Sequence, residues 1–150
     1  MTAEPVTEAE LVAQWEEAAR ARRLLLQRCE KCGVRQAYLR TVCASCQSSR
    51  LRLVEASGRA EVESFTWVHR AVFPGVAVPY AVARVRLVEG APLLATIIEA
   101  DEGSISCGDR VELVWQQGEN DVPVPAFAPI GRDGRQRGAP ACPGRNSGLG

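Results

Sequence analysis

The stretch CEKCGVRQAYLRTVCASC, residues 29–46, decides how this 150-residue chain is organised. It contains two Cys-x-x-Cys pairs that are separated by ten residues. Each pair directs two sulfur atoms of one tight turn at one ion, and Gly33 supplies the backbone freedom that such a turn needs. Four thiolates complete a tetrahedral Zn²⁺ shell and leave no position for water, so the spacing predicts a structural zinc site. The predicted ligands are Cys29, Cys32, Cys43 and Cys46.

The residues between the two pairs favour a zinc ribbon of rubredoxin-like type. The segment VRQAYLR, residues 34–40, alternates in polarity and is β-prone, as expected for a strand hairpin that links two metal-binding turns. A redox pair of Cys-x-x-Cys motifs is the alternative, and it is disfavoured because both pairs lie in one short hairpin. The ribbon is expected over residues 28–57.

An N-terminal helix is expected within residues 1–27. Thr7 and Glu10 have the spacing of a capping box, in which each side chain bonds the backbone N–H of the other residue. An apolar stripe follows at helical spacing. Its members are Leu11, Trp15, Ala18 and Ala19. Two interpretations stay open: the stripe packs on its own chain, or Trp15 docks on a partner subunit.

Residues 58–130 predict an all-β domain. Turn signals such as Pro74-Gly75 divide this segment into five short β-prone runs. The runs are residues 59–70, 80–90, 92–100, 110–115 and 124–130. In the second run, alternate residues are expected to face the core, namely Ala81, Ala83, Val85 and Leu87. Five strands in about 70 residues fit a Greek-key barrel of OB type, with a small sandwich as the competing fold.

Charge and composition divide the chain in the same way. The whole chain has no net charge, but the ribbon carries +4, residues 58–130 carry −5 and residues 131–150 carry +3. The last segment is rich in Gly, Pro and Arg and is expected to be disordered, with Cys142 inside it. No apolar run approaches the ~18 residues that span a bilayer, and the acidic start is not a signal peptide. A cytoplasmic, membrane-free protein with reduced thiols is expected.

A family resemblance covers about residues 15–131. The helix with its Trp, the run LLLQRCEKCG…VCASC, and SGRAEVESFTWVHRAVFPG…PYAVARVRLVEG resemble the thiolase-associated zinc-ribbon/OB-fold family, domain of unknown function thirty-five. The most specific pieces are the ribbon, the Ser57-Gly58 step, TWVHR at 66–70, FPG at 73–75 and Pro79-Tyr80. One departure is LRTVCASC, where the family usually has prolines before and within the second metal-binding turn.

The resemblance implies an accessory role. Family members partner thiolase-like enzymes or hydratases that act on acyl-CoA thioesters, in hetero-oligomers. By resemblance, this chain is expected to be a subunit with structural Zn²⁺ that docks on such an enzyme, such as a steroid side-chain aldolase or thiolase, and shares its CoA thioester ligand. Partnership with a MaoC-type acyl-CoA hydratase, or a scaffold role between thiolase and hydroxymethylglutaryl-CoA synthase, remains the alternative. Catalytic residues would then belong to the partner, and none is assigned here.

Two sets of candidate contact residues accompany this interpretation. CoA carries phosphates that Arg side chains bind well, and aromatic or imidazole groups can line a pantetheine channel. The candidate ligand-binding residues are Trp67, His69, Arg70, Arg84 and Arg86. The candidate docking residues are Trp15, Leu11 and Tyr38. Solvated charges on an open sheet face are the competing interpretation for the arginines.

Two functions of other classes were weighed against the accessory role. An OB fold also binds single-stranded nucleic acid, but a barrel at −5 repels the phosphate backbone, so no nucleic-acid partner is expected. An enzyme acting alone would need a nucleophile and a base, and outside the ribbon these are limited to Cys107 and His69. No motif brings that pair together, and a lone Cys is more often a small buried hydrophobe.

Overall fold

Helix α1 (Glu8–Arg20) begins at the capping box that the sequence predicts. The Glu10 amide donates to the Thr7 hydroxyl at 3.3 Å, and the Thr7 amide donates to the Glu10 carboxylate at 2.8 Å. One face of α1 is buried against the rest of the chain through Leu11, Ala18 and Ala19. The apolar stripe therefore packs on its own chain at these three positions, which is the first of the two interpretations.

The zinc ribbon contributes a three-stranded antiparallel sheet in the order β2-β1-β3. Its strands are β1 (Leu25–Cys29), β2 (Arg35–Gln36) and β3 (Leu51–Glu55). The first Cys-x-x-Cys turn joins β1 to β2, and the second lies in the long connection from β2 to β3. The predicted strand at 34–40 is thus shorter than expected. Glutamine side chains, described below, hold the remainder as a loop.

The second domain is a closed barrel of five strands in the order β4-β5-β6-β8-β7. The strands are β4 (Arg59–Val68), β5 (Tyr80–Leu87), β6 (Pro92–Ile97), β7 (Arg110–Gln116) and β8 (Val124–Pro129). Only β6 and β8 pair in parallel; a short 3₁₀ helix, η1 (Glu119–Asp121), connects β7 and β8. Every predicted run forms a strand, and this order is that of an OB-fold, which excludes the sandwich.

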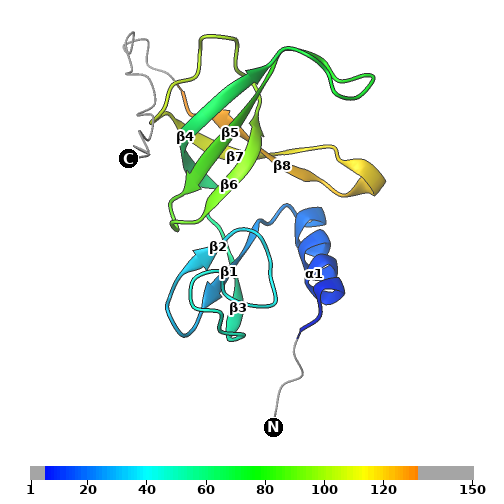
Figure 1. Ribbon diagram of the computed structural model, residues 1–150. Coiled ribbons are helices and arrows are strands. Elements are labelled where there is room, and N and C mark those ends of the chain that lie inside the picture. The colour runs from blue at the N-terminus through cyan, green and yellow to red at the C-terminus, as the bar shows by residue number, and fades with distance from the viewer. Residues whose placement is uncertain (1–5, 132–150) are drawn as a thin grey trace, which may run out of the picture.

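The barrel core extends into the ribbon. Alternate residues of β5 point inward as predicted: Ala81, Ala83, Val85 and Leu87 are all at most 1% exposed. Leu24 and Leu26, from the start of the ribbon, belong to the same buried cluster as these barrel residues. In Figure 1 the barrel stands above the ribbon, with α1 beside the ribbon sheet. The shared core joins the two domains into one packed unit.

The computed structural model describes residues 6–131. The expected disordered tail and Cys142 lie outside that range. Within it, no helix is long and apolar enough to cross a membrane.

Candidate metal centre

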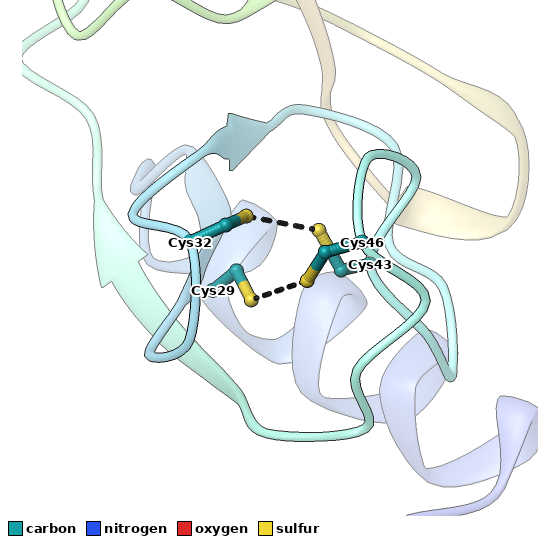
Figure 2. A group of neighbouring side chains, drawn as sticks. All are labelled: Cys29, Cys32, Cys43 and Cys46. Carbon is teal, nitrogen blue, oxygen red and sulfur yellow. Dashed lines mark hydrogen bonds between the residues drawn. The ribbon is translucent and has the colours of Figure 1, made fainter.

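The two Cys-x-x-Cys turns bring four sulfur atoms together (Figure 2). All four Sγ atoms lie within 4.8 Å of one another. The Sγ atoms of Cys29 and Cys46 are 3.6 Å apart, and so are those of Cys32 and Cys43. Cys29 and Cys43 are each 1% exposed, whereas Cys46 is half-buried and Cys32 is exposed, so the cluster is buried on one side and reaches the surface on the other. The structure confirms that the predicted ligands converge on one point.

The sulfur separations match a tetrahedral zinc site. A Zn–S bond of about 2.3 Å places the corners of a regular tetrahedron about 3.8 Å apart. The observed contacts of 3.6 Å agree with that edge, and the largest separation exceeds it by about an ångström. Four thiolates fill the four positions of such a site. The ion would therefore be structural, joining the two turns without binding water or substrate.

Both metal-binding turns have the same backbone hydrogen bonds. In the first, Gly33 N donates to Cys29 O at 2.9 Å, and Cys29 N donates to Val34 O at 2.9 Å. In the second, Gln47 N donates to Cys43 O at 3.0 Å, and Cys43 N donates to Ser48 O at 2.9 Å. The fourth residue after each first cysteine therefore adopts a left-handed conformation, with φ of 76° at Gly33 and 60° at Gln47. The sequence marks this position in the first turn only, by its glycine.

Because both turns have the same backbone geometry, we predict opposite effects on stability for exchanging Gly and Gln at the two left-handed positions. Gln47→Gly should stabilise the metal-bound protein slightly, by up to about 1 kcal/mol, because glycine adopts positive φ freely. Gly33→Gln should destabilise it by about 1 kcal/mol, since the left-handed region is strained for other residues. Urea unfolding of both zinc-loaded variants measures this. Loss of stability in Gln47→Gly would contradict the assigned equivalence of the two turns.

Backbone amides prepare the buried thiols for metal binding. The backbone amide of Cys32 lowers the pKa of Cys29 to about 6; burial opposes this shift, and the backbone amide of Lys31 adds to it. The amides of Cys46 and Ser45 lower the pKa of Cys43 in the same way. The Val34 amide also lowers the pKa of Cys32, but burial and the adjacent thiols outweigh it and raise that pKa to about 11. In the first pair, Cys29 is thus held closer to the thiolate form than Cys32.

Two buried glutamines support the loop that carries the second turn. The Gln27 side chain donates to Arg40 O and accepts from Arg40 N, both at 2.8 Å, as a neighbouring strand would. Gln36 donates to Gln27 at 2.8 Å and accepts from the Ala44 amide at 2.9 Å. Gln27 is 2% exposed and Gln36 is 8% exposed. These side chains thus support the loop that carries the second turn, LRTVCASC, which has no proline.

The glutamine pair was not anticipated from the sequence. A signal existed, because Gln27 follows three leucines directly and a polar residue within an apolar run is a candidate for a buried hydrogen-bonding role. The polarity pattern did not reveal this role, because both glutamines belong to strands in which polar residues are expected to face solvent.

We expect Gln27→Leu to loosen the second metal-binding turn. The substitution leaves Arg40 N and Arg40 O without their side-chain partner, at roughly 1–3 kcal/mol for each group that stays buried, and leaves the Gln36 Nε2 group only its 3.4 Å bond to Val42 O. Zinc affinity should fall about 10- to 100-fold, as for other groups that orient metal ligands. Competition with a chelator of known zinc affinity measures the change.

Gln14→Leu is the matched control, because Gln14 is an exposed residue of α1 and makes none of these bonds. The control should keep wild-type zinc affinity. Equal zinc affinities for Gln27→Leu and Gln14→Leu would show that the glutamine contacts do not support the metal site.

The five candidate ligand-binding residues lie on the barrel and do not converge on one described site. Arg84 and Arg86 both bind the carboxylate of Glu63, and Arg86 also donates to Gly90 O. Trp67 packs partly buried against the barrel core. His69 Nε2 lies 2.6 Å from Glu102 Oε1, and both side chains are exposed. Arg70 is exposed in the connection from β4 to β5.

The three candidate docking residues occupy different environments. Leu11 is 6% exposed and packs inside its own chain, so its side chain is not presented to a partner. Trp15 is half-buried on α1. Tyr38 is 53% exposed, and its hydroxyl accepts a 3.0 Å hydrogen bond from the Leu94 amide of β6. Tyr38 therefore joins the ribbon to the barrel while about half of its surface stays exposed.

An open groove of about 360 Å³ lies between α1 and the ribbon. Leu11 lines it from the helix, and Leu51 and Leu53 line it from β3. Polar residues of the connection between β2 and β3 complete the lining. None of the five candidate ligand residues borders this groove.

The sequence also offers Cys107 and His69 as a nucleophile and base. In the structure, His69 has a carboxylate neighbour, Glu102, and Cys107 is half-buried in the turn before β7.

Family models match both domains of the chain. Residues 17–52 match the rubredoxin-like zinc ribbon domain of ChsH2, and residues 53–116 match the C-terminal OB-fold domain of ChsH2. The zinc ribbon model and the four convergent sulfurs agree on the metal centre.

Curated relatives cover most of the chain. A DUF35 domain-containing scaffold protein of Methanothermobacter thermautotrophicus is 31% identical over 75% of this chain and 90% of its own length. A scaffold protein of the same description from Methanocaldococcus jannaschii is 27% identical over 74% and 80%. A probable enoyl-CoA hydratase alpha subunit of Thermomonospora curvata is 34% identical over 78% of this chain. The match spans 37% of that longer protein.

Solved structures show the same fold. A chain of the complex described as Ltp2-ChsH2(DUF35) aldolase is 34% identical, with a TM-score of 0.70 over 78% of this chain and 92% of that chain. A DUF35 protein of unknown function from Sulfolobus solfataricus shares the fold at 19% identity and a TM-score of 0.60, over 85% and 89%. With both ChsH2 domains in order and a closed four-cysteine ribbon below an OB barrel, the chain belongs to the DUF35 family.

Proposed function

We propose that this chain is a non-catalytic subunit that docks on a thiolase-like enzyme acting on acyl-CoA thioesters. The observation that carries the proposal is the four-sulfur site, which fills a tetrahedral ion and leaves no position for chemistry. The 34% identity to a chain of an aldolase complex, over 92% of that chain, indicates the class of partner. Within this class, an aldolase or thiolase that cleaves a steroid side-chain thioester is the proposed enzyme.

A hydratase partner is the second candidate. The Thermomonospora relative is described as a hydratase subunit, and this chain spans about a third of its length. The rest of that relative, which this chain does not match, is additional protein that a separate partner could replace. A MaoC-type acyl-CoA hydratase is therefore the alternative partner. The two relatives described as scaffold proteins support a scaffold role in general. A scaffold between thiolase and hydroxymethylglutaryl-CoA synthase is a further alternative within that role.

A direct contribution to the CoA site is the finer part of the proposal. Arg70 has no carboxylate partner among residues 6–131, so its guanidinium is available to a phosphate. Arg84 and Arg86 share the single carboxylate of Glu63, so the three side chains together keep one positive charge. Trp67 is the last residue but one of β4, and His69 and Arg70 follow directly after the strand. A shared CoA thioester is proposed to contact these barrel residues at more than one point, because they do not form a single pocket.

Reconstitution with a purified aldolase-type partner tests the proposal. Native mass spectrometry should show a complex that contains both chains and one zinc ion per copy of this chain. Acyl-CoA cleavage should require the partner and be absent from this chain alone. Turnover of an acyl-CoA thioester by the isolated chain would contradict the non-catalytic role. A stable complex with a hydratase, and none with the aldolase, would favour the alternative partner.

A further inference from the structure

Three arginines lie in register across the ribbon sheet. Arg28 of β1 is opposite Arg35 of β2 on one side and opposite Arg52 of β3 on the other. All three side chains are exposed. Residues in register on adjacent strands project from the same face, and neighbouring strands are about 4.8 Å apart. This arginine ladder (Arg28, Arg35 and Arg52) therefore places three positive charges within about 10 Å on one sheet face.

The barrel of the same chain pairs charges in the opposite way. Arg59 is opposite Glu112, and Glu61 lies between Arg86 and Arg110. Each of these charged pairs combines a base with an acid, which stabilises a sheet, whereas like charges directly opposite destabilise it. The ladder departs from this pattern at two successive pairs. Sheet stability therefore does not account for the ladder, and a ligand of opposite charge would.

The chain itself supplies little compensation to the ladder. Among residues 6–131, no carboxylate oxygen lies within 4.0 Å of the three guanidinium groups. Arg35 donates to the backbone carbonyl of Glu89 at 3.3 Å, which orients this arginine toward the barrel and leaves its charge unpaired. The two acids of the ribbon pair with other arginines, Glu30 with Arg50 and Glu55 with Arg23, each at 3.9 Å. The ladder is thus an exposed cationic surface that has no carboxylate partner in the described part of the chain.

We propose that the arginine ladder is the surface on which carboxylate groups of the partner subunit dock. Guanidinium groups bind carboxylates through paired N–H···O bonds, and a flat sheet face suits a flat protein surface. A small phosphate ligand needs a concave site, and of the three ladder residues only Arg52 borders the described groove, so the ladder as a whole does not line a pocket. A nucleic acid would meet the barrel at −5 beside three arginines. The inference rests on the proposed function, because it names how the chain binds that partner.

The test compares two charge-matched double variants of the full zinc-loaded chain. Arg28→Gln/Arg52→Gln removes two ladder charges and keeps Arg35 with its Glu89 contact. Arg59→Gln/Arg110→Gln removes two barrel charges, each opposite an acid. Affinity for the aldolase-type partner is measured by calorimetry at 50 mM and 300 mM NaCl. The ladder variant should bind at least about tenfold more weakly at low salt and lose most of the salt dependence, with the control within about twofold.

Each other outcome overturns a defined part of the account. If the wild-type chain binds and the ladder variant binds equally well, the ladder assignment is wrong and the proposed function stands. If the wild-type chain forms no complex, the proposed function falls and the ladder assignment with it. If the ladder variant loses zinc yet keeps partner affinity, the arginines only balance the charge of the thiolate cluster. Binding of single-stranded oligothymidine at 150 mM NaCl that depends on the ladder would show that the ladder binds a polyanion and not carboxylates of the partner.

Discussion

Cys29→Ser is expected to release zinc and unfold the ribbon. Structural zinc binding contributes roughly 10–16 kcal/mol at neutral pH over four ligands, so one ligand accounts for about 3 kcal/mol or more. Zinc affinity should therefore fall at least about 100-fold. Cys29 is 1% exposed at the end of β1, and the same strand carries Leu26 into the core shared with the barrel. Loss of the metal should consequently lower the thermal stability of the whole unit.

The control for this variant lies in the same turn. Lys31→Gln changes an exposed residue between two ligands and leaves all four sulfurs in place. Zinc per chain is measured by plasma mass spectrometry after dialysis against a chelator, and unfolding by circular dichroism. We expect zinc loss and a lowered Tm for Cys29→Ser, and wild-type values for Lys31→Gln. Full zinc retention by Cys29→Ser would contradict a four-sulfur site.

Gly58→Ala is expected to destabilise the barrel by about 3 kcal/mol. Gly58 has φ of 84°, a conformation that strains other residues by roughly 1–2 kcal/mol. An added Cβ would also lie 2.9 Å from the Leu113 Cβ, and overpacking of this kind costs about 1–3 kcal/mol. Relief by movement is limited, because the Leu113 amide donates to Gly58 O at 2.7 Å. Both effects fall on the junction where the chain leaves the ribbon and enters β4.

Gly103→Ala separates the two contributions. Gly103 has φ of 85°, nearly the same as Gly58, but nothing lies within 4 Å of an added Cβ. This variant should therefore lose only the strain, about 1–2 kcal/mol in urea unfolding. The difference between the two glycine variants measures the contact with Leu113. Equal losses for the two variants would show that the barrel accommodates the extra methyl group freely.

Local sequence signals predicted much of the architecture. Cys-x-x-Cys pairs identify their own turns, because the spacing itself places two sulfurs on one ion. Alternation over residues 81–87 identified the buried face of β5, and Thr7 with Glu10 identified the start of α1. In each case, the interaction joins residues that are at most a few positions apart, or the pattern repeats along one strand.

Features that depend on long-range register were not predictable. The arginine ladder exists only because β1 pairs with β3 across 24 residues, which places Arg28 opposite Arg52. Periodicity in residues 51–55 is too short to reveal that strand. Gln27 bonds a backbone segment 13 residues away, and its burial contradicts the polarity pattern of its strand. The positive φ of Gln47 could not be predicted, because glutamine does not favour this conformation. At the equivalent position of the first turn, glycine marks it in the sequence.

Zinc K-edge X-ray absorption on the assembled complex tests the central claim most directly. The spectrum should fit four sulfur neighbours at about 2.3 Å and should not change when an acyl-CoA thioester is added during turnover. That result would place bond-making in the partner and a purely structural ion in this chain. An oxygen or nitrogen neighbour at the metal, or a coordination shell that changes with substrate, would contradict the account.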